Sequence, residues 1–186
     1  MRHINAAVFG LILALVATIM MPSVAAQVED PTQSLANPKV AKLANSISGT
    51  WRCTERVAQP DGTALPKPGV LTIKSELGGH WLVYVLSWTP TKTSPGVTMI
   101  DYRTWDENRK RWQSYAFDSR GGFSQSETTQ ADDKSMTWAG KDVSDGKTFW
   151  WRSSEDIVSS TEMTFSAEGS VDGKNYSPMA HGKCER

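Results

Sequence analysis

The chain has 186 residues, with 20 Lys plus Arg balanced by 20 Asp plus Glu. This balance gives no basic excess of the kind that attracts nucleic acid or anionic lipid, so we predict neither as a partner. The length suits one domain with a substantial core and is short for two.

Residues 1–26 have the pattern of a secretory signal peptide. Arg2 is followed by an apolar run over 6–21, and Val24-Ala25-Ala26 forms a small-residue cleavage site. The run is shorter than the roughly 18 residues of a membrane-spanning helix, and no cysteine follows it as a lipid anchor. We expect cleavage before Gln27, a periplasmic or secreted location, and a mature chain without a membrane span.

Cys53 and Cys184 are the two cysteines of the chain. In an oxidising compartment they admit a single intramolecular pairing. Neither belongs to the close C-x-x-C spacing that metal binding or redox chemistry favours. We therefore predict a structural disulfide.

Residues 27–37 are polar and turn-rich and are predicted to form a flexible leader. Over 38–46 the apolar residues recur at helical spacing, with Asn37 as N-cap and Pro38 at the first helical position. So short a helix is unstable alone in water, and we expect it to plug one end of the structure that follows.

Alternating patterns then predict about ten strands. In the first, odd positions such as Trp51 and Cys53 are mainly apolar or small and even positions are polar. Regular turn signals separate the runs, as in an all-β barrel or sandwich. The predicted strands are approximately 47–57, 69–77, 80–89, 97–105, 112–118, 122–130, 135–140, 147–153, 158–167 and 175–184.

The fold class that follows is all-β: an antiparallel up-and-down barrel of about eight to ten strands over residues 38–186, with one short N-terminal helix. With an even number of strands, closure brings the first strand beside the last in antiparallel sense. Cys53 and Cys184 would then face each other across the closure. All eight tryptophans fall within the strand-like runs, either lining a cavity or simply filling the core.

Gly49-Thr50-Trp51, preceded by a short helix and followed by hairpins, resembles the entry of the lipocalin-like barrels of the calycin group. Together with 43–56, 77–82 and Asp101-Tyr102, it makes residues 38–186 similar to a family of exported bacterial proteins with a lipocalin-like domain of unknown function. The chain departs from true lipocalins, which place a Thr-Asp-Tyr element much later.

The lipocalin resemblance implies a late arginine across the indole of Trp51, a part for Arg152 or Arg186. A more distant resemblance is to nitrobindin-like haem barrels, whose entry is also a helix followed by Gly-Thr-Trp. That resemblance implies a haem held by a late histidine, and His181 is the candidate. The chain lacks their glycine-rich continuation, having Arg52-Cys53-Thr54 after Trp51.

Catalytic signatures are absent from the sequence. It has no Gly-x-Ser-x-Gly, no His-Glu-x-x-His and no glycine-rich nucleotide loop. The acid pairs Asp132-Asp133 and Glu155-Asp156 are predicted to lie in turns as solvated carboxylates. His80 and His181 fall on different strands, and no metal site is predicted. We expect a protein that is not an enzyme.

The strand over 97–105 carries the candidate binding chemistry. Asp101 and Arg103 share one face of it with Met99 and Trp105. If that face points inward, Arg103 would hold the carboxylate of a lipid-like ligand while apolar walls hold its tail. In the other orientation Ile100 and Tyr102 face inward, and the alternation does not decide between the two.

We predict Arg103, Tyr84 and Trp88 as ligand contacts. The expected function is that of an exported non-enzymatic protein that binds a small, largely apolar molecule inside a β-barrel, without a required cofactor. Two alternatives stay open: a structural or interaction module with a filled barrel, and a haem-binding barrel that uses His181. The sequence does not set the oligomeric state.

Overall fold

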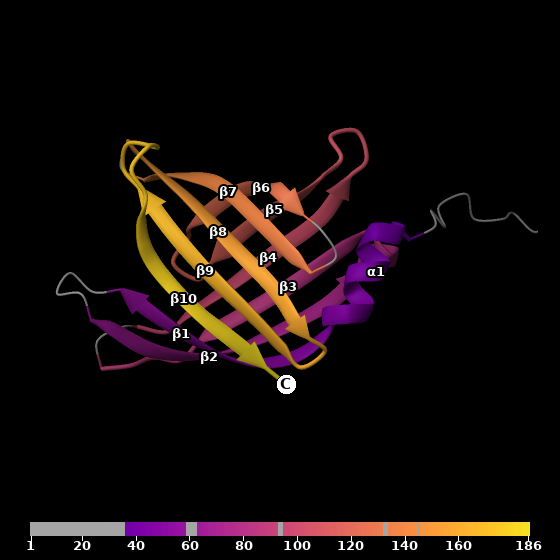
Figure 1. Cartoon of the computed structure of the whole chain (residues 1–186), viewed down its shortest axis with the longest axis horizontal. Coiled ribbons are helices and arrows are strands. Elements are labelled where there is room, and N and C mark those ends of the chain that lie inside the picture. The colour runs from indigo at the N-terminus through magenta and orange to yellow at the C-terminus, as the bar shows by residue number, and fades with distance from the viewer. Residues whose placement is uncertain (1–35, 59–62, 93–94, 132–133, 145) are drawn as a thin grey trace, which may run out of the picture. The chain divides into compact units, whose positions relative to one another are not determined.

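A computed structural model describes residues 36–58, 63–92, 95–131, 134–144 and 146–186. Ten antiparallel strands form a closed barrel in which each strand lies beside its neighbours in sequence and β1 closes against β10 (Figure 1). The predicted fold class is confirmed. The elements are α1 (Pro38–Ile47), β1 (Gly49–Ala58), β2 (Ala64–Glu76), a 3₁₀ turn (Leu77–Gly79), β3 (Trp81–Trp88), β4 (Val97–Asp106), β5 (Arg111–Asp118), β6 (Phe123–Ala131), β7 (Ser135–Ser144), β8 (Lys147–Ser159), β9 (Glu162–Ser170) and β10 (Ser177–Glu185).

Helix α1 begins as the sequence predicts. The side chain of Asn37 accepts hydrogen bonds from the backbone N–H groups of Lys39 and Val40, at 2.9 and 3.4 Å, which satisfies donors that a helix start leaves free. Four apolar side chains on one face of α1 are buried: Val40, Leu43, Ala44 and Ile47. This face packs against β2, β3 and β4, so the helix covers one end of the barrel (Figure 1).

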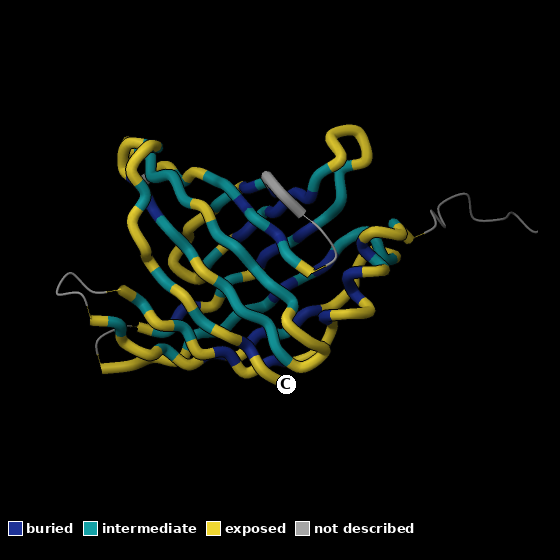
Figure 2. Tube along the Cα trace, in the orientation of Figure 1, coloured by how far each residue is buried: buried dark blue, intermediate teal, exposed yellow. Residues whose placement is uncertain are grey.

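Burial varies along the strands (Figure 2), and in β1 it alternates from residue to residue. In β1, Trp51 and Cys53 are buried, whereas Arg52 and Thr54 are exposed. Residues directly opposite one another in an antiparallel pair share a face, so the pairing of Trp51 with Leu71 continues the inward face from β1 into β2. The same reasoning carries this face around the whole barrel.

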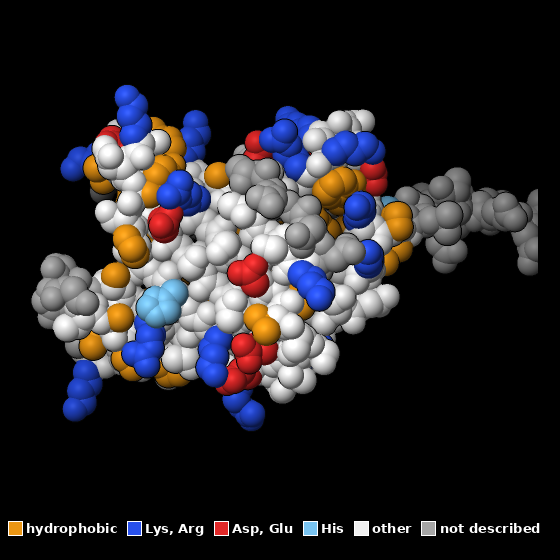
Figure 3. All heavy atoms as spheres, in the orientation of Figure 1, with side chains coloured by type: hydrophobic (Ala, Val, Ile, Leu, Met, Phe, Trp, Pro, Cys, Tyr) orange, Lys and Arg blue, Asp and Glu red, His pale blue; other side chains and the backbone are white. Residues whose placement is uncertain are grey.

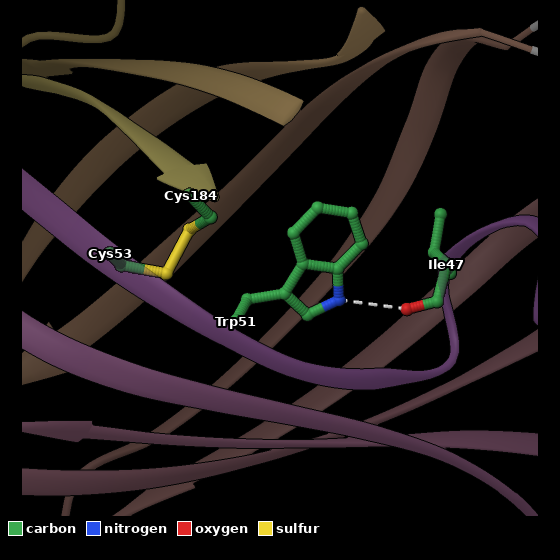
Figure 4. Close-up of a disulfide and its surroundings, with 4 residues drawn as sticks. All are labelled: Ile47, Trp51, Cys53 and Cys184. Carbon is green, nitrogen blue, oxygen red and sulfur yellow. Dashed lines mark hydrogen bonds between the residues drawn. A yellow bond between two sulfur atoms is a disulfide. The ribbon is translucent and has the colours of Figure 1, made fainter. Parts of the chain in front are cut away.

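The predicted disulfide is formed. Cys53 and Cys184 are register partners on β1 and β10, and their sulfur atoms are bonded (Figure 4). Both residues are buried, and 131 positions of sequence separate them. The bridge therefore joins the two strands that close the barrel.

Trp51 seals the barrel next to α1. It is fully buried, and its indole N–H donates to the Ile47 carbonyl at 2.9 Å (Figure 4). The guanidinium carbon of Arg186 lies 4.3 Å from the centre of the indole. Of the two arginines proposed for this position, Arg186 occupies it, whereas Arg152 pairs with Glu168 and lies over another ring.

Three strands, β2, β7 and β8, are longer than predicted by four residues or more. Strand β2 includes Pro66 and Pro68, which lie before Gly69, where its pairing with β3 begins. Pro68 only accepts a hydrogen bond on that side, from the Thr89 N–H at 2.8 Å, so this part of β2 tolerates residues without an N–H. Strand β8 runs on to Ser159. The prediction that Glu155-Asp156 lies in a turn is therefore wrong, because the hairpin turns at 160–161.

Residues 1–35, which include the predicted signal peptide and most of the leader, lie outside the described residues, as does the acid pair Asp132-Asp133.

Candidate functional site

A cavity of about 320 Å³ lies inside the barrel beneath α1. The disulfide sits in its wall, and most of its surface is apolar. The large apolar side chains of the lining are Leu43, Ile47, Leu71, Leu86, Trp88, Met99, Met136, Ile157, Met163 and Phe165. A pocket of this size and composition suits a small organic molecule.

Strand β4 turns its charged face inward. Asp101 and Arg103 are 3% and 8% exposed, whereas Ile100, the residue before Asp101, is 36% exposed. Both charged residues border the cavity. Of the two orientations that the sequence left open, the structure therefore has the one with Asp101 and Arg103 inside.

Arg103 is held by two carboxylates. Its Nε donates to Asp101 Oδ2 at 2.6 Å, and its Nη1 and Nη2 donate to the two oxygens of Glu155 at 2.6 and 2.8 Å. Ser114 Oγ donates to the other oxygen of Asp101 at 2.6 Å. Paired parallel bonds of this kind are among the stronger polar contacts in proteins. We call Arg103, Asp101 and Glu155 the Arg103 cluster.

Aromatic rings complete the surroundings of this guanidinium. Its carbon lies 3.9 Å from the centre of the Tyr84 ring and 4.7 Å from that of Trp138. Such positions are favourable for a cation. Trp138 is buried, and its indole N–H has no hydrogen-bond partner among the described residues.

The cluster carries an excess of negative charge, because one guanidinium faces two carboxylates. Burial alone would lower the pKa of Arg103, but attraction to Asp101 and Glu155 outweighs it and raises the pKa well above its usual value. Arg103 therefore stays charged. Burial also raises the pKa of Tyr84, against the attraction of Arg103, so its hydroxyl remains protonated at neutral pH.

Glu55 is a further carboxylate at the cavity. Its nearest cation is Lys67, whose Nζ lies 4.0 Å from Glu55 Oε2 and 5.5 Å from the centre of the Trp88 ring. Desolvation raises the pKa of Glu55, and Lys67 only partly offsets this. Glu55 is thus a partly buried acid with a weak partner.

All three predicted contact residues, Arg103, Tyr84 and Trp88, line this one cavity. Their role in holding a ligand stays a prediction. Sequence reasoning missed Glu155 because the acid pair Glu155-Asp156 was read as a turn. A signal was present, since the inward positions Trp151 and Ile157 continue an alternation on which Glu155 falls.

His181 points away from the cavity. It is exposed on β10 and lies between Ala180 and Gly182, which belong with Cys184 to the inward face of the strand. A haem inside the barrel would therefore have no ligand at this position. His80 also lies outside the cavity lining. Within the described ranges, no three His, Cys, Asp or Glu side chains gather in a way that could hold a metal ion.

A larger and more open hollow of about 1110 Å³ lies along β5, β6 and β7. It is lined from both faces of the sheet, by inward residues such as Ser126 and outward ones such as Gln125. Neither Arg103 nor Glu155 borders it. The smaller cavity is lined mainly by the inner face, with Asp156 and Thr164 as outer-face exceptions, and it borders the Arg103 cluster, so it is the better candidate site.

Comparison with known proteins places the fold. No family model matches the chain, and no curated protein sequence does. Rv2717c from M. tuberculosis has a similar structure, with a TM-score of 0.62, 12% identity, and coverage of 81% of this chain and 98% of that one. The 186-residue chain itself therefore has a calycin-like barrel fold. At such low identity the similarity extends to the fold alone.

Weaker similarities involve two other barrels. The redesigned β-barrel mFAP1, solved bound to DFHBI, has a TM-score of 0.45 and 16% identity over 78% of this chain and 99% of its own. A DUF3598-family protein of unknown function from Nostoc punctiforme has a TM-score of 0.24 and 10% identity over 78% of this chain and 98% of its own.

One face of the molecule can be followed in Figure 3, and it is mixed in charge. On the face shown in Figure 3, basic side chains lie around the rim with acidic ones among them, and no broad patch has a single sign. In the part of the chain that the structure describes, every helix is too short or too polar to span a membrane.

Proposed function

We propose that this protein binds a small, largely apolar molecule in the barrel cavity and releases it unchanged. The observation that carries the proposal is the cavity of about 320 Å³ beneath α1, with apolar walls and one buried group of charges. Binding sites for small molecules combine these features, since apolar walls supply affinity and a few fixed polar groups set the orientation.

The Arg103 cluster supports a binding role over a catalytic one. Arg103, Asp101 and Glu155 are bonded to one another, and the Asp101 carboxylate also accepts from Ser114. A general acid or base must instead offer its proton or lone pair to the substrate. Tyr84, whose pKa is raised by burial, is poorly suited to act as a base.

We also propose that the protein acts outside the cytoplasm, in the periplasm or the medium, after removal of residues 1–26. The disulfide between Cys53 and Cys184 supports this location, because such bonds persist mainly in oxidising compartments. A ligand taken up there would be held away from water.

The test uses a neutral dye and two adjacent positions of β2. N-phenyl-1-naphthylamine, excited directly, brightens in an apolar site. Leu71 lines this cavity and not the larger hollow, and its neighbour Val70 is exposed. We expect the dye to bind the unmodified protein, Leu71→Trp to weaken binding by at least about tenfold because the larger ring fills the space, and Val70→Trp to leave it unchanged.

Native mass spectrometry of protein from its own compartment adds a second readout. A bound mass of a few hundred daltons, lost on denaturation, would identify the ligand. If the dye does not bind and no mass is retained, the proposal is wrong and the barrel is a filled structural or interaction module. Dye binding that is equal in the two tryptophan variants would also reject this cavity as the site.

A further inference from the structure

We propose that the cavity selects ligands whose polar end is a cation, such as a protonated primary amine on an apolar body, and discriminates against carboxylates. This inference rests on the proposed function and specifies its ligand class. It reverses the expectation drawn from the sequence, in which a free Arg103 would hold a carboxylate.

The first step is that Arg103 is already occupied. Three of its N–H donors are used by Asp101 and Glu155, and Glu155 takes the paired arrangement that a ligand carboxylate would need. The rings of Tyr84 and Trp138 lie within 3.9 and 4.7 Å of the guanidinium carbon. A carboxylate ligand would have to displace Glu155 and then lie beside Asp101, so two like charges would meet in a desolvated place.

The second step is the charge of the lining. Four acids border the cavity, Glu55, Asp101, Glu155 and Asp156, against two bases, Arg103 and Lys134. Asp156 lies on the outer face of β8, where its register partners are Ser135 and Thr164, so three of these acids face inward. At the Arg103 cluster two carboxylates face one guanidinium, which leaves an excess of one negative charge there. Inside a barrel this charge is screened less than at an open surface, so it attracts a cationic ligand and repels an anionic one.

The third step concerns Glu55. The side chain of Glu55 is 17% exposed, and its Oε2 lies 4.0 Å from the Lys67 ammonium, a distance longer than a hydrogen bond. A partly buried acid with so distant a partner gains from a second cation that donates a hydrogen bond directly. Glu55 is thus the acid of the lining with the most to gain from a ligand amine.

The fourth step is the aromatic wall between the two glutamates. Across β1, β10, β9 and β8 the register runs Glu55, Gly182, Phe165, Glu155, which places Phe165 between the two carboxylates on the inner face. A β-carbon at Gly182 would clash with the Thr54 carbonyl oxygen and lie 2.5 Å from the tip of the Phe165 ring, so glycine leaves room both for the β1 backbone and for this ring. An aromatic face flanked by acids favours cations through its quadrupole.

The test compares three ligands with the same tail: octylamine, octanoate and octanol. For each ligand, the concentration that displaces N-phenyl-1-naphthylamine from the full protein is measured at neutral pH and low salt. We expect octylamine to displace the dye at a concentration at least about tenfold lower than octanoate, with octanol between them. Glu55→Gln and Glu155→Gln should each reduce this preference, and Glu76→Gln, at an exposed position of β2, should leave it unchanged.

The outcomes separate the inference from the function on which it rests. If the dye binds and octanoate competes as well as octylamine, the cation preference is wrong and the proposed function stands. If neither the dye nor any of the three ligands binds, the proposed function itself fails. Should Glu155→Gln not fold by circular dichroism, Glu55→Gln decides alone, and an unchanged preference in it overturns the inference.

Discussion

Removal of the disulfide should destabilise the protein strongly, because the bond joins positions far apart in the chain. Cys53 and Cys184 are separated by 131 positions. For a loop of that length the chain-entropy treatment gives a stabilisation of about 5 kcal/mol at 25 °C, and measured bridges commonly deliver about 2–4 kcal/mol. For a domain of this size, a loss of that order lowers the melting temperature by about 5–20 °C.

The perturbation is replacement by alanine, which keeps the site small and apolar, in the single variants Cys53→Ala and Cys184→Ala and in the double variant. Urea unfolding measures the free energy and its dependence on urea. Both single variants and the double variant should lose a similar amount, since each removes the same bond. The urea dependence should steepen, because the unfolded chain expands without the cross-link.

Reduced wild-type protein is the control, and its unfolding midpoint should match that of the double variant. The reasoning is refuted if the double variant loses less than about 1 kcal/mol, or if the losses of the two single variants add up in the double variant. Additive losses would mean that each side chain acts through its own packing.

Three further predictions concern the inner face. Arg103→Met should cost about 3–5 kcal/mol in urea unfolding by leaving Asp101 buried without a cation, and a loss below about 1 kcal/mol would contradict this. Burial raises the pKa of Glu55, so the folded state binds its proton more tightly and stability falls as pH rises through the window between the unfolded and folded values; Glu55→Gln should therefore gain on wild type as the pH rises above the ordinary glutamate value of 4.5, and a constant difference would argue against it. Trp138→Phe should cost less than Trp51→Phe, because only the indole N–H of Trp51 has a hydrogen bond to lose, and equal losses on thermal unfolding would oppose that view.

The barrel could be predicted from the sequence because its signals are local. Alternation around Trp51 and Cys53 identifies a half-buried strand, and turn residues at regular spacing separate ten such runs. The start of the helix at Asn37 depends on hydrogen bonds between one side chain and the backbone two or three residues later. Closure of an even-stranded barrel then places Cys53 beside Cys184 without further information.

The candidate site could be predicted only in part, because its chemistry depends on contacts across the barrel. Arg103, Tyr84 and Trp88 were all identified as cavity residues. The partner that occupies Arg103, Glu155, lies 52 positions away and four strands further round the barrel. No local pattern records such a contact, and Glu155 next to Asp156 has the composition of a turn. The face of β4 was equally undecidable, since both of its faces mix apolar and polar residues.

The topology also has a consequence for how the chain reaches its folded state. Nine of the ten strand pairings join consecutive strands, which form hairpins on a microsecond scale, whereas β1 and β10 are separated by nearly the whole domain. The pairing of β1 with β10, the seam of the barrel, is therefore expected to form last. Until then the sheet is open, and its two unpaired edge strands are exposed to other chains. Because Cys53 and Cys184 sit on that seam, the disappearance of free thiols during oxidative refolding would time the closure of the barrel.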